Sequence, residues 1–225
     1  MGGTVIRCLR VLPFRKYILP LALELPPPSD DQFHFAFAND AAMGNLGYER
    51  AKADHYPTPP WVTEAVIPRL LEYRSKATAV WEPACGDGAM TNVLAGHFDR
   101  VVSTDLHDYG FGTPGIDFME ASLPEGVGMI VTNPPYGDDA EKFVRRALDL
   151  MRPVGGVVAM LMRHEYDCSK GRVDLFNQPP FAGKVVLTSR PRWIAGSTGS
   201  PRHNYSWYLW TFGQNIFPTL SYSVR

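Results

Sequence analysis

The tetrapeptide Asn133-Pro134-Pro135-Tyr136 combines residue types that are suited to chemistry on an amine. It directly follows an apolar run at 127–132, which predicts a buried strand. Proline biases the residue before it toward extended backbone, so Asn133 should stand at the strand tip with its side chain directed outward. Both prolines have a fixed φ and no N–H group, which makes the loop after the strand stiff.

This loop presents two hydrogen-bond acceptors at one point. An exocyclic amine on an aromatic base is a poor nucleophile, because its lone pair is delocalised into the ring. The side-chain oxygen of Asn133 and the backbone carbonyl of Pro134 can accept the two amine hydrogens and thereby free the lone pair. Tyr136 can stack on the base and hold it. A proline-rich turn without chemistry is the alternative, but its place at the end of an apolar strand favours a catalytic role.

A glycine-rich turn predicts a cofactor site. An apolar strand at 77–81 leads into the segment Glu82-Pro83-Ala84-Cys85-Gly86-Asp87-Gly88. Glycines let a backbone approach a ligand closely, and doubly wound folds bind ligands beyond the carboxyl ends of their strands. Asp105 lies 19 residues after Gly86 (105 − 86), the spacing of an acid that holds ribose hydroxyls. Thr91 stands where a dinucleotide fingerprint would have its third glycine, so an ordinary tight turn remains an alternative.

Strands and helices alternate along most of the chain. Helical spacing is found at 61–73, 90–98 and 138–151, and strand-like runs at 77–81, 100–106, 127–132, 156–162, 184–188 and 205–212. This order predicts an α/β fold with a doubly wound, mostly parallel sheet. The chain of 225 residues suits one such domain with an appendage. Prolines at 26–28 indicate a loosely ordered arm over residues 1–45, followed by a catalytic domain over 46–225.

The charge balance limits how the protein can bind nucleic acid. The 22 basic and 23 acidic residues give a formal net charge of −1, so any contact with phosphates must come from a local patch. One candidate patch lies in a Gly/Ser-rich segment between the last two predicted strands, where arginines surround an aromatic ring. A solvated hairpin loop is the alternative. The residues are Arg190, Arg192, Trp193 and Arg202.

The cysteines and the apolar segments favour a cytoplasmic protein without a metal. Cys8, Cys85 and Cys168 lack the spacing of a zinc site or a disulfide framework. The apolar stretch at 11–25 is broken by prolines and basic residues, so neither a membrane span nor a secretory signal is expected.

Taken together, these residues resemble the amino-methyltransferase branch of the class I S-adenosylmethionine-dependent family. More narrowly, they are similar to the small phage- and prophage-type adenine-specific DNA methyltransferases. The resemblance covers residues 56–212, with the first motif at 81–88 and the catalytic motif, in its adenine form, at Asn133 through Tyr136. It implies S-adenosylmethionine as cofactor and a Rossmann-like, seven-stranded sheet whose last strand is antiparallel.

The resemblance also implies roles for individual residues. The segment containing Tyr56, Thr58 and Pro59 would hold the methionine end of the cofactor. Asp117 and Phe118, at the end of a third short strand, would read and cover its adenine, unless they are a surface acid beside a core ring. The complete cofactor set is Tyr56, Thr58, Pro59, Glu82, Pro83, Ala84, Gly86, Gly88, Asp105, Asp117, Phe118 and Asn133.

Several substrates share this chemistry. Adenine N6 in DNA is the first expectation, and RNA or a protein glutamine amide are alternatives, as is a non-catalytic binding module that keeps the fold. Methylation of cytosine C5 is disfavoured, because it needs a cysteine where Asn133 stands. Only 13 residues follow Phe212 (225 − 212), so the loops after Tyr136 and between the last strands are expected to read the target.

Overall fold

The computed structural model describes residues 56–73, 79–137, 139–177, 180–194, 196, 198, 200–213 and 216–223. The arm expected at residues 1–45 lies outside the described residues, as does the start of the domain that should follow it. The division of the chain at residues 45 and 46 therefore stays a prediction.

A seven-stranded sheet forms the centre of the described chain, with strand order β2-β1-β3-β4-β6-β5-β7. Only β6 runs against its neighbours β4 and β5, and every other pairing is parallel. This confirms the predicted α/β fold with a mostly parallel sheet. The strands are β1 Ala79–Glu82, β2 Arg100–Ser103, β3 Val127–Thr132, β4 Val157–Arg163, β5 Phe181–Val186, β6 Tyr205–Thr211 and β7 Thr219–Tyr222.

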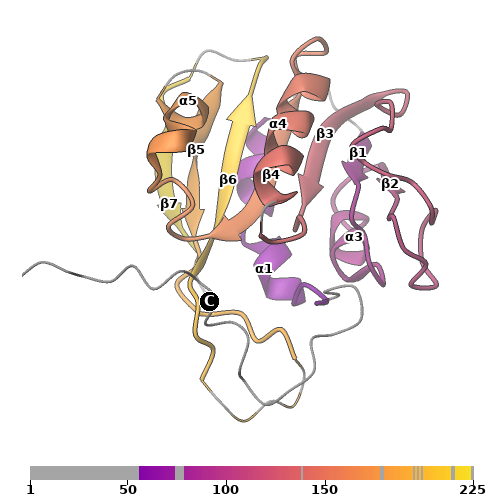
Figure 1. The fold of residues 1–225 in the computed structure, drawn as a ribbon, viewed down its shortest axis with the longest axis horizontal. Helices are drawn as coiled ribbons and strands as arrows, with labels where there is room; N and C mark the ends of the chain where they lie inside the picture. The colour runs from indigo at the N-terminus through magenta and orange to yellow at the C-terminus, as the bar shows by residue number, and fades with distance from the viewer. Residues whose placement is uncertain are drawn as a thin grey trace, which may run out of the picture. The chain divides into compact units, whose positions relative to one another are not determined.

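Helices cover both faces of this sheet (Figure 1). On one face, helices α1 to α3 bury side chains such as Val62 and Leu94 against Val131 of β3. On the other face, α4 and α5 bury Val144 and Leu175. Because the central strands are covered on both faces, side chains on both faces are buried, and the sequences of these strands are nearly continuous hydrophobic runs. The helices are α1 Pro60–Glu64, α2 Ile67–Glu72, α3 Ala89–Leu94, α4 Asp139–Met151 and α5 Val173–Phe176, preceded by the 3₁₀ helix η3 Lys170–Arg172.

The helix predicted at 61–73 is in fact two short helices, α1 and α2. Pro68 explains the break. Its ring would clash with the carbonyl of the residue four positions earlier, which is Glu64, the last residue of α1, and it has no N–H to continue the ladder. The single-helix expectation was wrong because helical spacing of apolar residues continues across the break.

The third short strand predicted before Asp117 is absent from the described residues. That region is a loop whose contact with the end of β2 is one isolated bridge, between Thr104 and Thr113. Gly110 and Gly112 have φ values of 78° and 68° there, a left-handed conformation that an extended strand does not contain. The seventh strand is instead β7, which pairs in parallel with β5 after the antiparallel strand β6.

Candidate functional site

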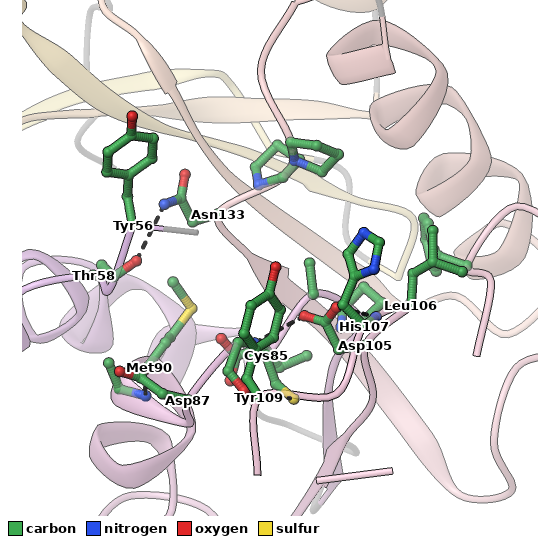
Figure 2. A pocket seen from close by; sticks show the side chains of 18 of the residues that line it. Tyr56, Thr58, Cys85, Asp87, Met90, Asp105, Leu106, His107, Tyr109 and Asn133 are labelled. Atoms are coloured by element: carbon green, nitrogen blue, oxygen red, sulfur yellow. Dashed lines mark hydrogen bonds between the residues drawn. The ribbon is translucent and has the colours of Figure 1, made fainter. Parts of the chain in front are cut away.

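A cavity lies at the carboxyl ends of β1, β2 and β3, between the glycine turn and the tetrapeptide after β3 (Figure 2). This is the position that a doubly wound sheet provides for a ligand. Pro59 and Gly88 were predicted to contact a cofactor but do not line the cavity. The predicted residues that do line it are Tyr56, Thr58, Glu82, Pro83, Ala84, Gly86, Asp105, Asp117, Phe118, Asn133, Pro134, Pro135 and Tyr136.

Gly88 lies outside the cavity lining, and its lack of a side chain lets a neighbouring loop pack closely. It precedes α3 with φ 84°, and a Cβ atom there would lie 2.7 Å from the ring of Phe111. The loop after β2 therefore packs directly on the glycine turn. This loop also brings His107 and Tyr109 into the cavity wall, with their rings 6.1 Å apart edge to face. Neither residue was predicted, because no periodic pattern marks a position in an irregular loop.

Asp105 joins the glycine turn to that same loop. Its buried carboxylate accepts hydrogen bonds from the backbone N–H of Gly86 and from that of His107, both at 2.9 Å. Each carboxylate oxygen has a further lone pair, so both remain able to accept a hydroxyl. Asp105 is thus held in one orientation at the edge of the cavity (Figure 2).

Glu82 is a buried carboxyl in the cavity wall, with 2% of its surface exposed. Burial raises its pKa to about 8, and a hydrogen bond donated by the Thr91 hydroxyl opposes part of that shift. Thr91 also contacts the hydroxyl of Ser103 at 2.8 Å. Thr91, which stands where a dinucleotide fingerprint would have its third glycine, thus positions the carboxyl group of Glu82. A nearby cation would favour the ionised form of Glu82.

The raised pKa of Glu82 predicts a pH-dependent stability. Its pKa is about 8 in the folded protein and 4.5 as an ordinary glutamate, so its contribution to stability is present below 4.5 and is lost as pH rises through 8. The Glu82→Gln variant, which lacks this titration, should gain thermal stability relative to the original protein as pH increases from 5 to 8. Melting temperatures across this range measure it, with the exposed Glu125→Gln as control. A difference in melting temperature between Glu82→Gln and the original protein that stays constant from pH 5 to 8 would contradict the raised pKa of Glu82.

Asn133 is held between two hydroxyls at the tip of β3. Its side-chain N–H donates to Thr58 Oγ1 at 3.2 Å, and its Oδ1 accepts from the Tyr136 hydroxyl at 2.5 Å (the Thr58 contact is drawn in Figure 2). The first contact ties the segment before α1 to the loop after β3. The second places a hydroxyl donor on the oxygen that is expected to accept an amine hydrogen. Burial raises the pKa of Tyr136 well above its ordinary value, so this hydroxyl remains a proton donor.

Asp117 and Phe118 were expected either to contact the adenine of the cofactor or to be a surface acid beside a core ring, and they have features of both. Phe118 is 2% exposed, and its ring packs on Trp81 at 5.2 Å and on Phe143 at 4.5 Å between ring centroids. It is a core residue whose ring also borders the cavity. Asp117 is exposed at the cavity, and its Oδ1 accepts from the Met119 N–H at 2.9 Å.

The four residues of the predicted nucleic-acid patch lie between β5 and β6 and do not line the cavity. Arg190 braces this loop, because its guanidinium donates to Asn204 Oδ1 at 2.8 Å and to the Pro201 carbonyl at 3.1 Å. Trp193 packs edge to face on Tyr205 at 5.0 Å. Tyr205 in turn contacts the ring of Tyr136 at 5.8 Å, so aromatic rings connect the loop to the tetrapeptide after β3. The remaining two residues, Arg192 and Arg202, are exposed.

The thiol of Cys85 also lines the cavity. Burial raises the pKa of the Cys85 thiol to about 12, which makes it a poor nucleophile at neutral pH. Within the described residues, no group of three or more His, Cys, Asp or Glu side chains is arranged to bind a metal ion. In the ranges that the structure covers, no helix has the length and apolarity that a membrane crossing requires.

No family model and no curated protein matches the sequence. Solved structures do resemble it. A protein named as a class I S-adenosylmethionine-dependent methyltransferase from Listeria monocytogenes matches 77% of this chain and 67% of its own, with a TM-score of 0.57 and 16% identity. A protein named as an RNA methyltransferase from Pyrococcus horikoshii matches 76% of this chain and 94% of its own, with a TM-score of 0.56 and 15% identity.

A third similar structure is a type I restriction-modification methyltransferase subunit from Streptococcus thermophilus, with a TM-score of 0.54 and 11% identity. It matches 71% of this chain, which spans 45% of that subunit. The sheet order, the mixed strand directions and these neighbours together define the fold as that of the class I S-adenosylmethionine-dependent methyltransferases.

Proposed function

We propose that this protein transfers the methyl group of S-adenosylmethionine to N6 of adenine in DNA. The observation that carries the proposal is the placement of Asn133. Its side chain stands at the end of β3, beside the stiff proline pair, in the wall of a cavity that also contains the glycine turn and Asp105. An acceptor for an amine and a site for a cofactor thus face the same space.

The residues in the cavity fit S-adenosylmethionine. Asp105 offers two oriented carboxylate oxygens to a ribose diol, and the buried Glu82 suits the cationic amino group of the methionine end. The bound sulfonium supplies an already activated methyl group, so positioning of the amine should contribute most of the rate, on the order of 7–11 kcal/mol. Asn133 and the Pro134 carbonyl orient the amine and free its lone pair.

The role of Asp105 predicts a change in cofactor binding. Asp105→Ala removes the acceptor for the ribose hydroxyls and also the brace between Gly86 and His107. The dissociation constant for S-adenosylmethionine, measured by calorimetry, should rise several-fold, corresponding to about 1 kcal/mol for a net hydrogen bond. Asp149→Ala, an exposed acid on α4, serves as control. An unchanged affinity would remove Asp105 from this role.

The basic and aromatic loop between β5 and β6 supports a nucleic-acid substrate. Arg192 and Arg202 are suited to phosphates, and Trp193 is suited to stacking on a base. A base within a duplex would have to leave the stack to reach Asn133, at a cost of roughly a few kcal/mol. The resemblance to a restriction-modification subunit favours DNA, and the resemblance to a protein named as an RNA methyltransferase makes RNA the second candidate.

The substrate is tested by offering DNA, RNA and protein separately with S-adenosylmethionine labelled in its methyl group. Label in DNA that nucleoside analysis identifies as N6-methyladenine is the expected result. Label found only in RNA, or only in a protein amide, would overturn the DNA proposal while keeping the transferase chemistry. Absence of label in all three, with cofactor bound, would favour a non-catalytic binding module.

A further inference from the structure

Arg163 lies beside the catalytic loop but was not predicted to have a role. It is the last residue of β4, the strand next to β3, and the register pairs Thr132 of β3 with Met160 of β4. Because β3 and β4 are parallel, Arg163 at the end of β4 lies at the same carboxyl edge of the sheet as Asn133. On its other side, Arg163 is paired with Tyr205, the first residue of β6.

The guanidinium of Arg163 is close to the aromatic residues of this edge. Burial raises the pKa of both Tyr136 and Tyr205, and the positive charge of Arg163 opposes that shift in each of them. One cation is thus near the hydroxyl that contacts Asn133 and also near the ring that packs against Trp193. Arg163 therefore lies near the point where the packed rings of Trp193 and Tyr205 meet Tyr136.

The ring of His203 lies next to Arg163 and orients its side chain. Nη2 of Arg163 donates to Nε2 of His203 at 3.4 Å. Arg163 also forms an ion pair with Glu165, at 3.8 Å from Nη1 with 60% of the Glu165 side chain exposed, and such a surface pair contributes little. The guanidinium of Arg163, held at the end of β4 by the ring of His203, has further N–H donors, and its chemistry suits an anion.

The backbone around this pair is held in place before any ligand binds. The N–H of His164 donates to the Asn204 carbonyl at 3.0 Å, and Arg190 braces the side chain of Asn204. His164 itself is turned toward Ser206, with Nδ1 2.9 Å from the hydroxyl oxygen. Because the ends of β4 and β6 are fixed together, little ordering of the loop should be needed when an anion binds.

We infer that Arg163, positioned by His203, binds a phosphodiester group of a polynucleotide beside the methylated base. The planar guanidinium fork matches phosphate oxygens, and the adjacent ring of Tyr136 suits a base. A protein glutamine amide has no anion of its own next to the reacting nitrogen. The inference rests on the proposed function and adds a phosphate contact beside the reacting base of its DNA substrate. In this role Arg163 positions the substrate and takes no part in the transfer itself.

The test compares Arg163→Gln with Arg152→Gln, which removes the same charge from the turn between α4 and β4, where Arg152 packs on Phe212 at 5.0 Å. Binding of a fluorescent adenine-containing DNA duplex is followed by anisotropy at increasing salt. At about 50 mM salt, Arg163→Gln should weaken binding by about tenfold, and the slope of log affinity against log salt should become shallower by about one unit. Arg152→Gln should match the original protein, and Arg163→Lys should recover part of the loss.

Steady-state kinetics separate positioning from catalysis. Arg163→Gln should raise the KM for DNA, leave kcat nearly unchanged, and leave the affinity for S-adenosylmethionine unchanged. An unaltered affinity and salt slope, or a loss confined to kcat, would overturn the inference and leave the proposed function standing. DNA binding that depends on Arg163 without methylation of adenine would overturn the proposed function instead. Label only in a protein amide, with no nucleic-acid binding, would overturn both.

Discussion

Replacing Asn133 with alanine should lower the rate of methyl transfer by about 10²–10³-fold, the loss typical of removing one hydrogen-bonding group that acts on developing charge. The physical reason is that the amine loses the side-chain acceptor that frees its lone pair, while the sulfonium is as reactive as before. The affinity for S-adenosylmethionine should change little, because Asp105 and Glu82 belong to other segments of the cavity wall, and Figure 2 shows Asp105 well apart from Asn133. Single-turnover kinetics and calorimetry measure the two quantities.

The matched control for this variant is Asn92→Ala, which removes an exposed asparagine from α3. It should keep the full rate of transfer. Asn133 also donates to Thr58, so the melting temperature of Asn133→Ala should be recorded to show that the fold is retained. A variant that folds, binds the cofactor and still transfers methyl groups at the original rate would show that the acceptor lies elsewhere.

Two substitutions at Tyr136 should have different effects. Tyr136→Ala removes the ring, and loss of base stacking of about 1–3 kcal/mol should lower kcat/KM by about 5–150-fold. Tyr136→Phe keeps the ring and removes the hydroxyl that donates to Asn133 Oδ1. Because that hydroxyl competes with the substrate amine for the same oxygen, the phenylalanine variant should be at least as active as the original protein. Steady-state kinetics with DNA measure both variants.

Tyr222→Ala, a change at an exposed tyrosine of β7, controls for general effects of losing an aromatic ring. Equal losses in Tyr136→Phe and Tyr136→Ala would mean that the hydroxyl is needed, as it would be if it orients Asn133 for the amine. In that case the contact between the two side chains belongs to the active arrangement and does not compete with the substrate.

Most of the sheet could be predicted from hydrophobic patterns, because strands covered on both faces are continuous apolar runs. The strand predicted at 127–132 has the same bounds as β3, and the runs at 156–162 and 205–212 agree with β4 and β6 to within a residue or two. β7 was missed because its four residues are mostly exposed and carry no such run. The break at Pro68 was missed because apolar spacing outweighed the proline.

The sequence by itself determined the features that depend on neighbouring residues. The proline pair makes the loop after β3 stiff and sets Asn133 at the strand end. The glycines and the spacing to Asp105 place a ligand site at the same edge of the sheet. These are consequences of local backbone chemistry, so they can be read without knowing what packs against them.

Only the tertiary structure decided the partners and the burial of these groups. Asn133 meets Thr58 across 75 residues of sequence, and Arg163 meets His203 across 40. The raised pKa of Glu82 requires an apolar surrounding that no short motif reveals. A local pattern fixes the conformation of a segment, whereas a charge or a hydrogen bond depends on which distant segments the fold brings beside it.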